Sequence, residues 1–203
     1  MDQHKKTALV TGASRGIGRA TAAALAKDGA HVLVHYGRSA REAESLVSEI
    51  QTEGGLANAI SADLGTPNGA ALLAKQVRSI VGDRLGVLVL NAGISKAARL
   101  ADYTVEDFDN LFATNVRSPF FLVQQLLPIL GEGSNIIVIS SLGSHAVPGK
   151  PAVDTPSILA YSSTRGTLGC HSGSGHERAV EKRRAMFGTR FPTYAGKRTS
   201  LDE

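Results

Sequence analysis

Cysteine, tryptophan and long apolar runs are scarce or absent in this sequence, and each absence excludes a class of protein. Cys170 is the single cysteine, which excludes an intrachain disulfide and a disulfide-held scaffold. The longest apolar stretch, FFLVQQLLPIL at 120–130, is broken by two glutamines and a proline and is too short to cross a bilayer. The opening residues MDQHKKTALV contain no apolar segment of secretory length. These features predict a cytoplasmic protein without a membrane segment.

A strong excess of charge is also absent from most of the chain. The formal net charge is +4, but residues 170–203 hold seven of the 22 Lys and Arg and four of the 18 Asp and Glu. Residues 1–169 therefore carry 15 basic and 14 acidic side chains, a net charge of +1. A nucleic-acid interface needs basic side chains clustered on the fold itself. We therefore predict no nucleic-acid partner.

Apolar strand patterns alternate with helix patterns through residues 1–169. Strands are expected at 7–10, 31–36, 56–63, 87–90 and 135–140, and helices at 15–28, 39–53, 66–81, from 104 onward and at 116–130. The expected helix caps are Ser39, Thr66 followed by Pro67, and a capping box of Thr104 with Asp107. Continuous apolar strands separated by helices are typical of a parallel sheet covered on both faces. We predict an α/β fold, a Rossmann-like doubly wound parallel sheet with helices on both faces.

The character of the sequence changes after residue 169. Val180 and Leu201 are the only Ile, Leu or Val residues in 170–203, and segments such as HSGSGHE are typical of flexible, solvated chain. We therefore predict one domain, 1–169, followed by a basic, irregular tail, 170–203. His171 and His176 lie near Cys170, but their spacing matches no common zinc site, so no metal site is predicted.

The glycine-rich motif TGASRGIG at 11–18 lies between the first expected strand and the first expected helix. Gly12, Gly16 and Gly18 allow a sharp turn and a close approach of the backbone to a pyrophosphate. The N-terminus of the following helix supplies amide donors and a partial positive charge for the same anion. This position in a βαβ pattern favours a dinucleotide-binding loop over a turn that is merely tight.

The end of the second expected strand indicates which dinucleotide is preferred. An acidic residue there would bind the ribose 2′-hydroxyl of NAD, but HVLVHYGRSA at 31–40 contains none. Arg38 and Ser39 occupy that region, and Arg15 lies in the glycine loop. Two cations without a carboxylate favour the 2′-phosphate of NADP(H), although both arginines could also be ordinary exposed side chains.

The order of these motifs resembles the short-chain dehydrogenase/reductase family, in particular its 3-oxoacyl-[acyl-carrier-protein] reductase-like members. The similar motifs are TGASRGIG, Asp63-Leu64, NAG at 91–93, Asn115 in ATNV, Ser141 in ISSLGS, and YSSTR at 161–165 in place of Tyr-x-x-x-Lys. The resemblance covers residues 7–166. It implies a cofactor site formed by Gly12, Ser14, Arg15, Gly16, Ile17, Gly18, Arg38, Ser39, Asp63, Leu64, Asn91, Ala92, Gly93, Tyr161 and Arg165.

The resemblance also implies a reaction, in which a hydride passes from NADPH to a carbonyl or 3-oxoacyl substrate. Tyr161 would be the acid/base, Ser141 would stabilise the carbonyl oxygen, Asn115 would organise a proton relay, and Arg165 would take the place of the lysine. A cation near the phenol favours the phenolate. The expected partners are a small carbonyl or acyl-thioester substrate and further copies of the chain in a homodimer or homotetramer.

Three departures from the family pattern lead us to expect impaired catalysis. Arg165 keeps the positive charge of the lysine but does not give up a proton at neutral pH. The segment at 142–160 is longer than usual and either shapes substrate specificity or is tolerated padding. The family pattern stops near Leu168, which suggests that the C-terminal edge of the sheet is incomplete. The alternatives are an inactive dinucleotide-binding remnant and a protein-interaction module.

Overall fold

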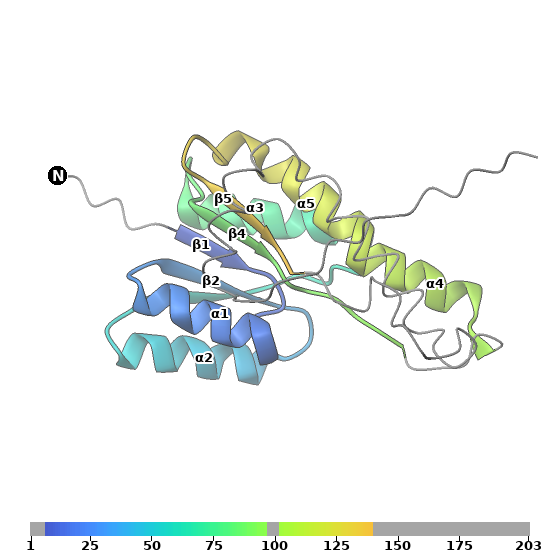
Figure 1. Ribbon diagram of the computed structural model, residues 1–203, viewed down its shortest axis with the longest axis horizontal. Coiled ribbons are helices and arrows are strands. Elements are labelled where there is room, and N and C mark those ends of the chain that lie inside the picture. The colour runs from blue at the N-terminus through green and yellow to red at the C-terminus, as the bar shows by residue number, and fades with distance from the viewer. Residues whose placement is uncertain (1–6, 97–101, 140–203) are drawn as a thin grey trace, which may run out of the picture. The chain divides into compact units, whose positions relative to one another are not determined.

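The computed structural model describes residues 7–96 and 102–139, which build a five-stranded parallel sheet (Figure 1). The order across the sheet is β3-β2-β1-β4-β5. The strands are β1 (Thr7–Val10), β2 (His31–Tyr36), β3 (Leu56–Ser61), β4 (Val87–Leu90) and β5 (Asn135–Val138). The chain winds outward from β1 to β3 and then returns to β4 on the other side of β1. This order confirms the predicted doubly wound, Rossmann-like sheet.

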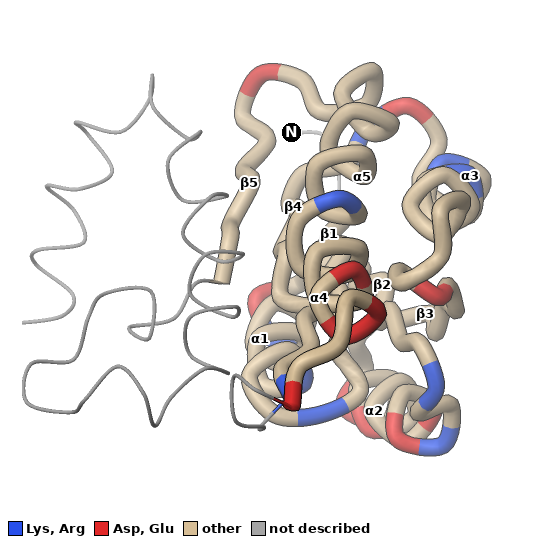
Figure 2. Tube along the Cα trace, turned by 90° about the vertical axis from the view of Figure 1, so that its right-hand side faces the viewer, with Lys and Arg blue, Asp and Glu red and all other residues tan. Residues whose placement is uncertain are grey.

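Helices cover both faces of this sheet (Figures 1 and 2). One face carries α1 (Gly16–Lys27) and α2 (Ala40–Thr52), and the other carries α3 (Gly69–Val81) and α5 (Ser118–Leu126). The remaining helical elements are α4 (Val105–Phe112), the π-helical turn η2 (Ala113–Arg117) and the 3-10 turn η3 (Leu127–Ile129). Within the described residues, no helix is both long and apolar enough to cross a membrane.

Strand alternation divides the buried side chains into two cores. On β1, Leu9 packs toward α3 and α5, whereas Val10 packs toward α1 and α2. The first core adds Leu73 from α3 and Leu122 from α5, and both side chains are completely buried. The four residues of β4 are all buried as well. This pattern explains why the inner strands are continuously apolar in sequence.

The start of α3 differs from the sequence expectation, which placed a cap at Thr66 and the first helical residue at Pro67. The helix begins at Gly69, after Asn68 at the cap position. The Thr66 hydroxyl donates instead to the carbonyl of Asp63 at 2.8 Å and so closes a turn after β3. An added Cβ on Gly69 would lie 2.0 Å from the Asp63 carbonyl oxygen, so only glycine allows the helix to start against this turn.

The helix expected separately at 116–130 is continuous with the one that begins after Thr104. The capping box is confirmed, because the Thr104 hydroxyl accepts from the Asp107 amide and the Asp107 carboxylate accepts from the Thr104 amide. From α4 the chain passes through η2, where the amide of Ser118 donates to the carbonyl of Ala113, directly into α5. A π-helical turn hidden inside a helix leaves no apolar signature, so the sequence pattern divided one helix into two.

The cap of α2 and the burial of β5 also differ from expectation. Ser39 stands at the cap position of α2, as predicted, but its side chain makes no capping hydrogen bond. The outer strand β5 is partly exposed, with Ile136 at 45% exposure, although its sequence is as apolar as that of the buried strands. An apolar strand pattern therefore does not by itself indicate how a strand is covered.

Candidate functional site

A pocket of about 710 Å³ lies at the carboxyl ends of the strands, where the chain reverses its direction of winding between β1 and β4. This is the position at which open α/β sheets bind ligands. Segments that follow β1, β2, β3 and β4 form its walls together with the end of α4 and the start of η2. The lining residues are Gly12, Ser14, Arg15, His35, Gly37, Arg38, Ser39, Ala62, Asp63, Leu64, Gly65, Thr66, Asn91, Ala92, Gly93, Ile94, Asn110 and Thr114.

The glycine loop needs its glycines for two different physical reasons. Gly12 and Gly16 have φ angles of 64° and 57°, in the left-handed region that disfavours side chains. Gly18 has no such angle, but an added Cβ would lie 2.4 Å from the Gly12 carbonyl oxygen and 2.5 Å from Nδ2 of Asn91. Gly18 therefore lets α1 pack directly on the turn, which brings the N-terminus of the helix to the pocket.

The NAG motif after β4 is joined to the glycine loop by hydrogen bonds. The Thr11 hydroxyl donates to the Val89 carbonyl at 3.2 Å and accepts from the amides of Asn91 and Ala92 at 2.9 and 3.0 Å. Nδ2 of Asn91 donates to the carbonyls of Thr11 and Gly12 at 3.0 and 3.1 Å. Asn91 and Ala92 were predicted as cofactor residues, and what the structure shows is that they hold the loop after β1 in place.

His35 lies beneath the pocket on β2 and was not predicted from the sequence. Its side chain is buried, with Nδ1 accepting from the Gly12 amide at 3.1 Å and Nε2 donating to the Ala62 carbonyl at 3.1 Å. Burial lowers the pKa of His35 to about 4, and the hydrogen bond to Ala62 opposes this change only in part. The imidazole is therefore neutral at pH 7, with its proton on Nε2.

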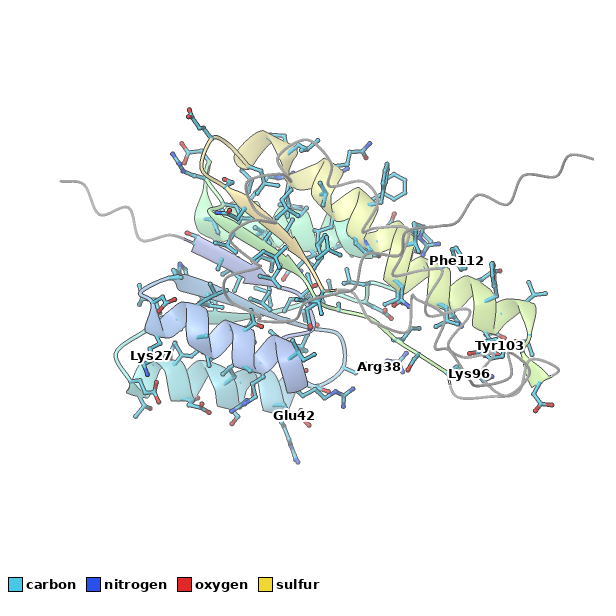
Figure 3. All side chains as sticks on the ribbon, in the orientation of Figure 1. Lys27, Arg38, Glu42, Lys96, Tyr103 and Phe112 are labelled. Atoms are coloured by element: carbon cyan, nitrogen blue, oxygen red, sulfur yellow. The ribbon has the colours of Figure 1, made fainter. Side chains whose placement is uncertain are left out.

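The rim of the pocket favours an anion. Arg15 and Arg38 are both exposed and line the pocket, and Figure 3 places Arg38 at the end of the sheet where α1 begins. Arg15 is the cap residue of α1 but makes no side-chain capping hydrogen bond, and the first turn of α1 contains no acidic residue. Among the described residues, the first-turn amides of α1 therefore have neither a capping side chain nor an acidic neighbour in that turn. Elsewhere on the described chain, basic and acidic residues are interspersed (Figure 2).

The loop after β3 is fastened to the helix on the opposite wall. The amide of Gly65 donates to Oδ1 of Asp63 at 2.9 Å, which shapes the loop locally. Nη2 of Arg117 donates to the Gly65 carbonyl at 2.7 Å, and the Ser118 hydroxyl donates to the Leu64 carbonyl. Consecutive residues of η2 and α5 therefore hold consecutive carbonyls of the loop that carries Asp63.

Asn115 lies in η2 and is completely buried. Its Oδ1 accepts from the amide of Ile94 and its Nδ2 donates to the carbonyl of the same residue, both at 2.9 Å. The side-chain amide thus mimics a strand partner for the segment that follows β4. In this structure Asn115 positions that segment at the pocket mouth, where Ile94 contributes to the lining.

An ion pair joins the segment after β4 to the first turn of α4. Nζ of Lys96 lies 2.5 Å from Oδ2 of Asp107, and the Tyr103 hydroxyl donates to the Lys96 carbonyl at 2.5 Å. The hydrogen bond from Lys96 lowers the pKa of Asp107, and the Thr104 amide acts in the same direction. Figure 3 shows Lys96 and Tyr103 together beside α4. These contacts fix the start of α4 relative to the strand that leads into it.

Most of the predicted cofactor residues meet in one pocket. Those that line it are Gly12, Ser14, Arg15, Arg38, Ser39, Asp63, Leu64, Asn91, Ala92 and Gly93. Gly16, Ile17 and Gly18 follow at the start of α1 and are not part of the lining. Ser141, Tyr161 and Arg165 lie outside the described residues, as does the predicted tail, so their assignments stay predictions.

The sequence interpretation missed several lining residues. These are His35, Gly37, Ala62, Gly65, Thr66, Ile94, Asn110 and Thr114. Asn110 and Thr114 are four residues apart and so share one face of the helical segment, which was the available signal. His35 had a weaker signal, because a single polar residue in an apolar strand indicates a buried hydrogen bond without naming its partners.

Comparison with known proteins supplies the family. The family model for short chain dehydrogenases matches residues 6–166. Versicolorin reductase 1 from Aspergillus parasiticus is 40% identical over 171 residues, and versicolorin reductase stcU from Emericella nidulans is 39% identical over 163. These alignments cover 82% and 80% of this chain but only 62% and 59% of the two relatives.

A solved structure agrees with this assignment. The angucycline C-6 ketoreductase LanV with bound NADP is 36% identical to this chain, with a TM-score of 0.74. The superposition covers 88% of this chain and 68% of LanV. The match of the family model, the identity to the two reductases and the shared fold lead to the same conclusion. This chain belongs to the short-chain dehydrogenase family.

Proposed function

We propose that this chain binds NADP(H) and transfers hydride between the nicotinamide and a carbonyl group of a small molecule. The observation that carries the proposal is the pocket at the reversal point of the sheet, where the glycine loop meets an anion-ready helix end. Gly12, Arg15 and Arg38 belong to this one pocket. The proposed activity is that of an oxidoreductase, and membership of the short-chain dehydrogenase family supports this class of enzyme.

The residues present fit a dinucleotide. Gly16 presents bare backbone at the start of α1, because its φ of 57° disfavours a side chain and an added Cβ would meet no described atom within 4 Å. A pyrophosphate needs this kind of bare surface together with helix-end amides. In the proposal, the start of α1 holds the pyrophosphate and Asp63 binds at the adenine end. The reduced nicotinamide supplies the hydride when the cofactor is bound.

The preference for NADP(H) rests on charge. Arg15 and Arg38 provide two cations on the pocket rim, and the segment between Tyr36 and Ser39 contains no carboxylate that would repel a 2′-phosphate. The Ser39 hydroxyl makes no capping bond to α2, which suits a role as a phosphate donor. LanV was solved with NADP, which supports the same cofactor for this relative of it.

Proton transfer is assigned to residues by their motifs. In the proposal, Tyr161 gives a proton from its phenolic oxygen to the substrate oxygen, while Ser141 hydrogen-bonds that oxygen and stabilises the charge that develops there. Arg165 supplies positive charge that favours the phenolate, but it is a poor proton carrier. We therefore propose slow turnover relative to a chain with lysine at 165.

The substrate proposal has two branches, a 3-oxoacyl thioester and a polycyclic ketone. The motif resemblance favours the first. The second is favoured by the C-6 ketoreductase LanV, which is 36% identical to this chain and was also solved with NADP and rabelomycin. Both substrates present a carbonyl for reduction, so the reaction class does not depend on the choice.

One experiment separates the enzyme from its alternatives. NADPH and NADH binding is measured by calorimetry, and NADPH oxidation is followed with a 3-oxoacyl thioester and with rabelomycin, for the native chain and for Arg165→Lys. We expect tighter binding of NADPH than of NADH and faster turnover in Arg165→Lys. Binding without turnover in either protein would indicate a dinucleotide-binding remnant. Absence of NADPH binding would overturn the proposal and leave the protein-interaction module.

A further inference from the structure

We propose that His35 is a positioning residue: its imidazole, anchored at the Ala62 carbonyl, accepts from the Gly12 amide, fixes the turn at Gly12 and so preforms the pocket for the dinucleotide. The turn at Gly12 forms one rim of the pocket, and the segment at Ala62 and Asp63 forms another. This inference rests on the proposed NADP(H) binding, because it concerns the shape of that same site. Neither the glycine loop motif nor the family comparison assigns a role to His35.

The imidazole of His35 makes its hydrogen bonds just beyond the ends of the regular ladders between the strands. The regular ladder between β1 and β2 ends at Val10 opposite Val34. The chain then turns at Gly12, and the Ala13 amide still donates to the backbone carbonyl of His35 at 2.8 Å. Pairing between β2 and β3 continues to Tyr36 opposite Ser61. The side chain of His35 links the two segments that follow these ladders. Its Nδ1 accepts from the Gly12 amide, and its Nε2 donates to the Ala62 carbonyl. A single rigid ring therefore spans from the loop after β1 to the loop after β3.

Gly12 is consequently held from both sides. His35 accepts its amide hydrogen at 3.1 Å, and Nδ2 of Asn91 donates to its carbonyl at 3.1 Å. Together with the bond from the Ala13 amide to the backbone carbonyl of His35 at 2.8 Å, these two bonds fix how the peptide groups around Gly12 are turned. Loss of the His35 side-chain bond would leave a partly buried amide without its acceptor and would loosen the turn at Gly12.

The ring has one tautomer that satisfies both neighbours. A backbone amide can only donate and a backbone carbonyl can only accept, so Nδ1 must be bare and Nε2 must carry the proton. Burial favours this neutral form. The pocket's charged side chains, Arg15, Arg38 and Asp63, come from the loops after β1, β2 and β3.

Two substitutions separate the two hydrogen bonds. In His35→Asn, the side-chain oxygen lies near the position of Nδ1 and can accept from the Gly12 amide. In His35→Gln, the amide lies near the position of Nε2 and can donate to Ala62, but Gly12 loses its acceptor. We expect the NADPH Kd of His35→Asn to stay within about threefold of the native value, and that of His35→Gln to rise roughly tenfold.

Melting temperatures of the two variants provide the control for a purely structural role. Both variants lose one of the two bonds, so their melting temperatures should fall by similar amounts while their NADPH affinities diverge. Equal NADPH affinity in the two variants, whether native or weakened, would overturn the proposal. Native-like binding by His35→Asn amounts to rescue by the variant that keeps the Gly12 bond.

A measurement on the native protein keeps the inference testable if a variant does not fold. Long-range ¹H–¹⁵N spectra report the imidazole tautomer, and hydrogen exchange reports protection of the Gly12 amide. We expect a neutral ring protonated at Nε2 and a protected Gly12 amide; the Nδ1-protonated tautomer or a rapidly exchanging amide would overturn the proposal. If the native chain does not bind NADPH, the proposed function fails, whereas these two readouts still decide whether His35 holds the turn.

Discussion

The two faces of the sheet are filled by different kinds of side chain. The face under α1 and α2, called here the alanine face, contains Ala8, Ala13, Ala22, Ala26, Ala30, Ala43 and Ala57 among its buried residues. The face under α3 and α5, called here the leucine face, contains Leu9, Leu33, Leu64, Leu73, Leu85, Leu88, Leu90, Leu122 and Leu126. Both faces are closely packed, but small side chains let a helix lie nearer to its sheet.

The two faces therefore have different roles, because one positions the glycine loop and the other stabilises the fold. On the alanine face, Ala22 and Gly18 bring α1 close enough for its first turn to meet the glycine loop at Gly12. On the leucine face, each buried side chain removes more apolar area from water and so contributes more to the free energy of unfolding. We therefore expect changes on the leucine face to alter stability and changes on the alanine face to alter cofactor binding.

The largest effect is expected from a truncation on the leucine face. Leu122 is completely buried on α5, so Leu122→Ala should lower the free energy of unfolding by about 3 kcal/mol. The pocket is lined by other elements, so the NADPH Kd of the folded protein should change little. Urea unfolding and calorimetry measure the two quantities. Leu127→Ala is the matched control, because Leu127 is 56% exposed and its truncation should cost less than about 0.5 kcal/mol.

The next largest effect is expected from pH, through the polar residue that interrupts the leucine face. His35 follows Leu33 on the same side of β2, and burial lowers the pKa of His35 from 6.5 to about 4. The unfolded chain therefore binds a proton between these two pKa values that the folded chain does not bind. The contribution of the neutral, buried His35 to stability is fully present above pH 6.5 and is lost as the pH decreases toward 4.

The size of this effect follows from the difference between the two pKa values. Lowering the pH from about 7 to about 5 should reduce the free energy of unfolding by roughly 2 kcal/mol through His35 alone. Urea unfolding at both pH values measures it, with His35→Asn as the reference that lacks the imidazole. The same pH dependence in both proteins would show that other groups cause it.

A smaller loss of stability with a larger loss of binding is expected on the alanine face. Gly18→Ala places a Cβ 2.4 Å from the Gly12 carbonyl oxygen, so α1 must move away from the turn. We expect a cost of about 1–2 kcal/mol in unfolding free energy and a roughly tenfold rise in the NADPH Kd. Gly131→Ala is the control, because Gly131 has no positive φ and an added Cβ there meets no atom within 4 Å. Unchanged NADPH affinity in Gly18→Ala would contradict the positioning role of this face.

The sequence predicted the features that arise from local patterns. Apolar runs such as HVLVHY at 31–36 located the strands, and the glycine spacing located the loop, because both depend on the residues themselves. Most of the predicted cofactor residues then met in one pocket, since the carboxyl ends of parallel strands share one edge of a sheet.

Features that depend on a distant partner could not be predicted. Thr66 is a residue type that often caps helices, but its hydroxyl donates to the Asp63 carbonyl instead. The helix α3 begins at Gly69, where the backbone of the turn at Asp63 lies close to the helix. The π-helical turn around Asn115 accompanies a hydrogen-bonded pairing with Ile94, which lies 21 residues earlier in the chain. His35 looked like part of an apolar strand, and its role follows only from the positions of two loops on neighbouring strands.

The smallest effect is expected at the rim of the alanine face, where α2 begins. Arg38 is exposed, so its interaction with a 2′-phosphate is screened by water and salt. We expect Arg38→Ser to raise the NADPH Kd by about fivefold to tenfold and to leave the NADH Kd unchanged. The change should shrink at higher ionic strength, which calorimetry in two salt concentrations would detect.

Arg41→Ser separates a specific contact at Arg38 from a general effect of charge. Arg41 is also exposed, and it lies three residues further along the chain but does not line the pocket. Both substitutions remove one positive charge, so they change the long-range field of the protein by similar amounts. An effect of Arg38→Ser on NADPH that Arg41→Ser does not reproduce therefore assigns the 2′-phosphate to the Arg38 side of the pocket. Equal effects on NADPH and NADH in Arg38→Ser would instead place Arg38 near the pyrophosphate, which both cofactors share.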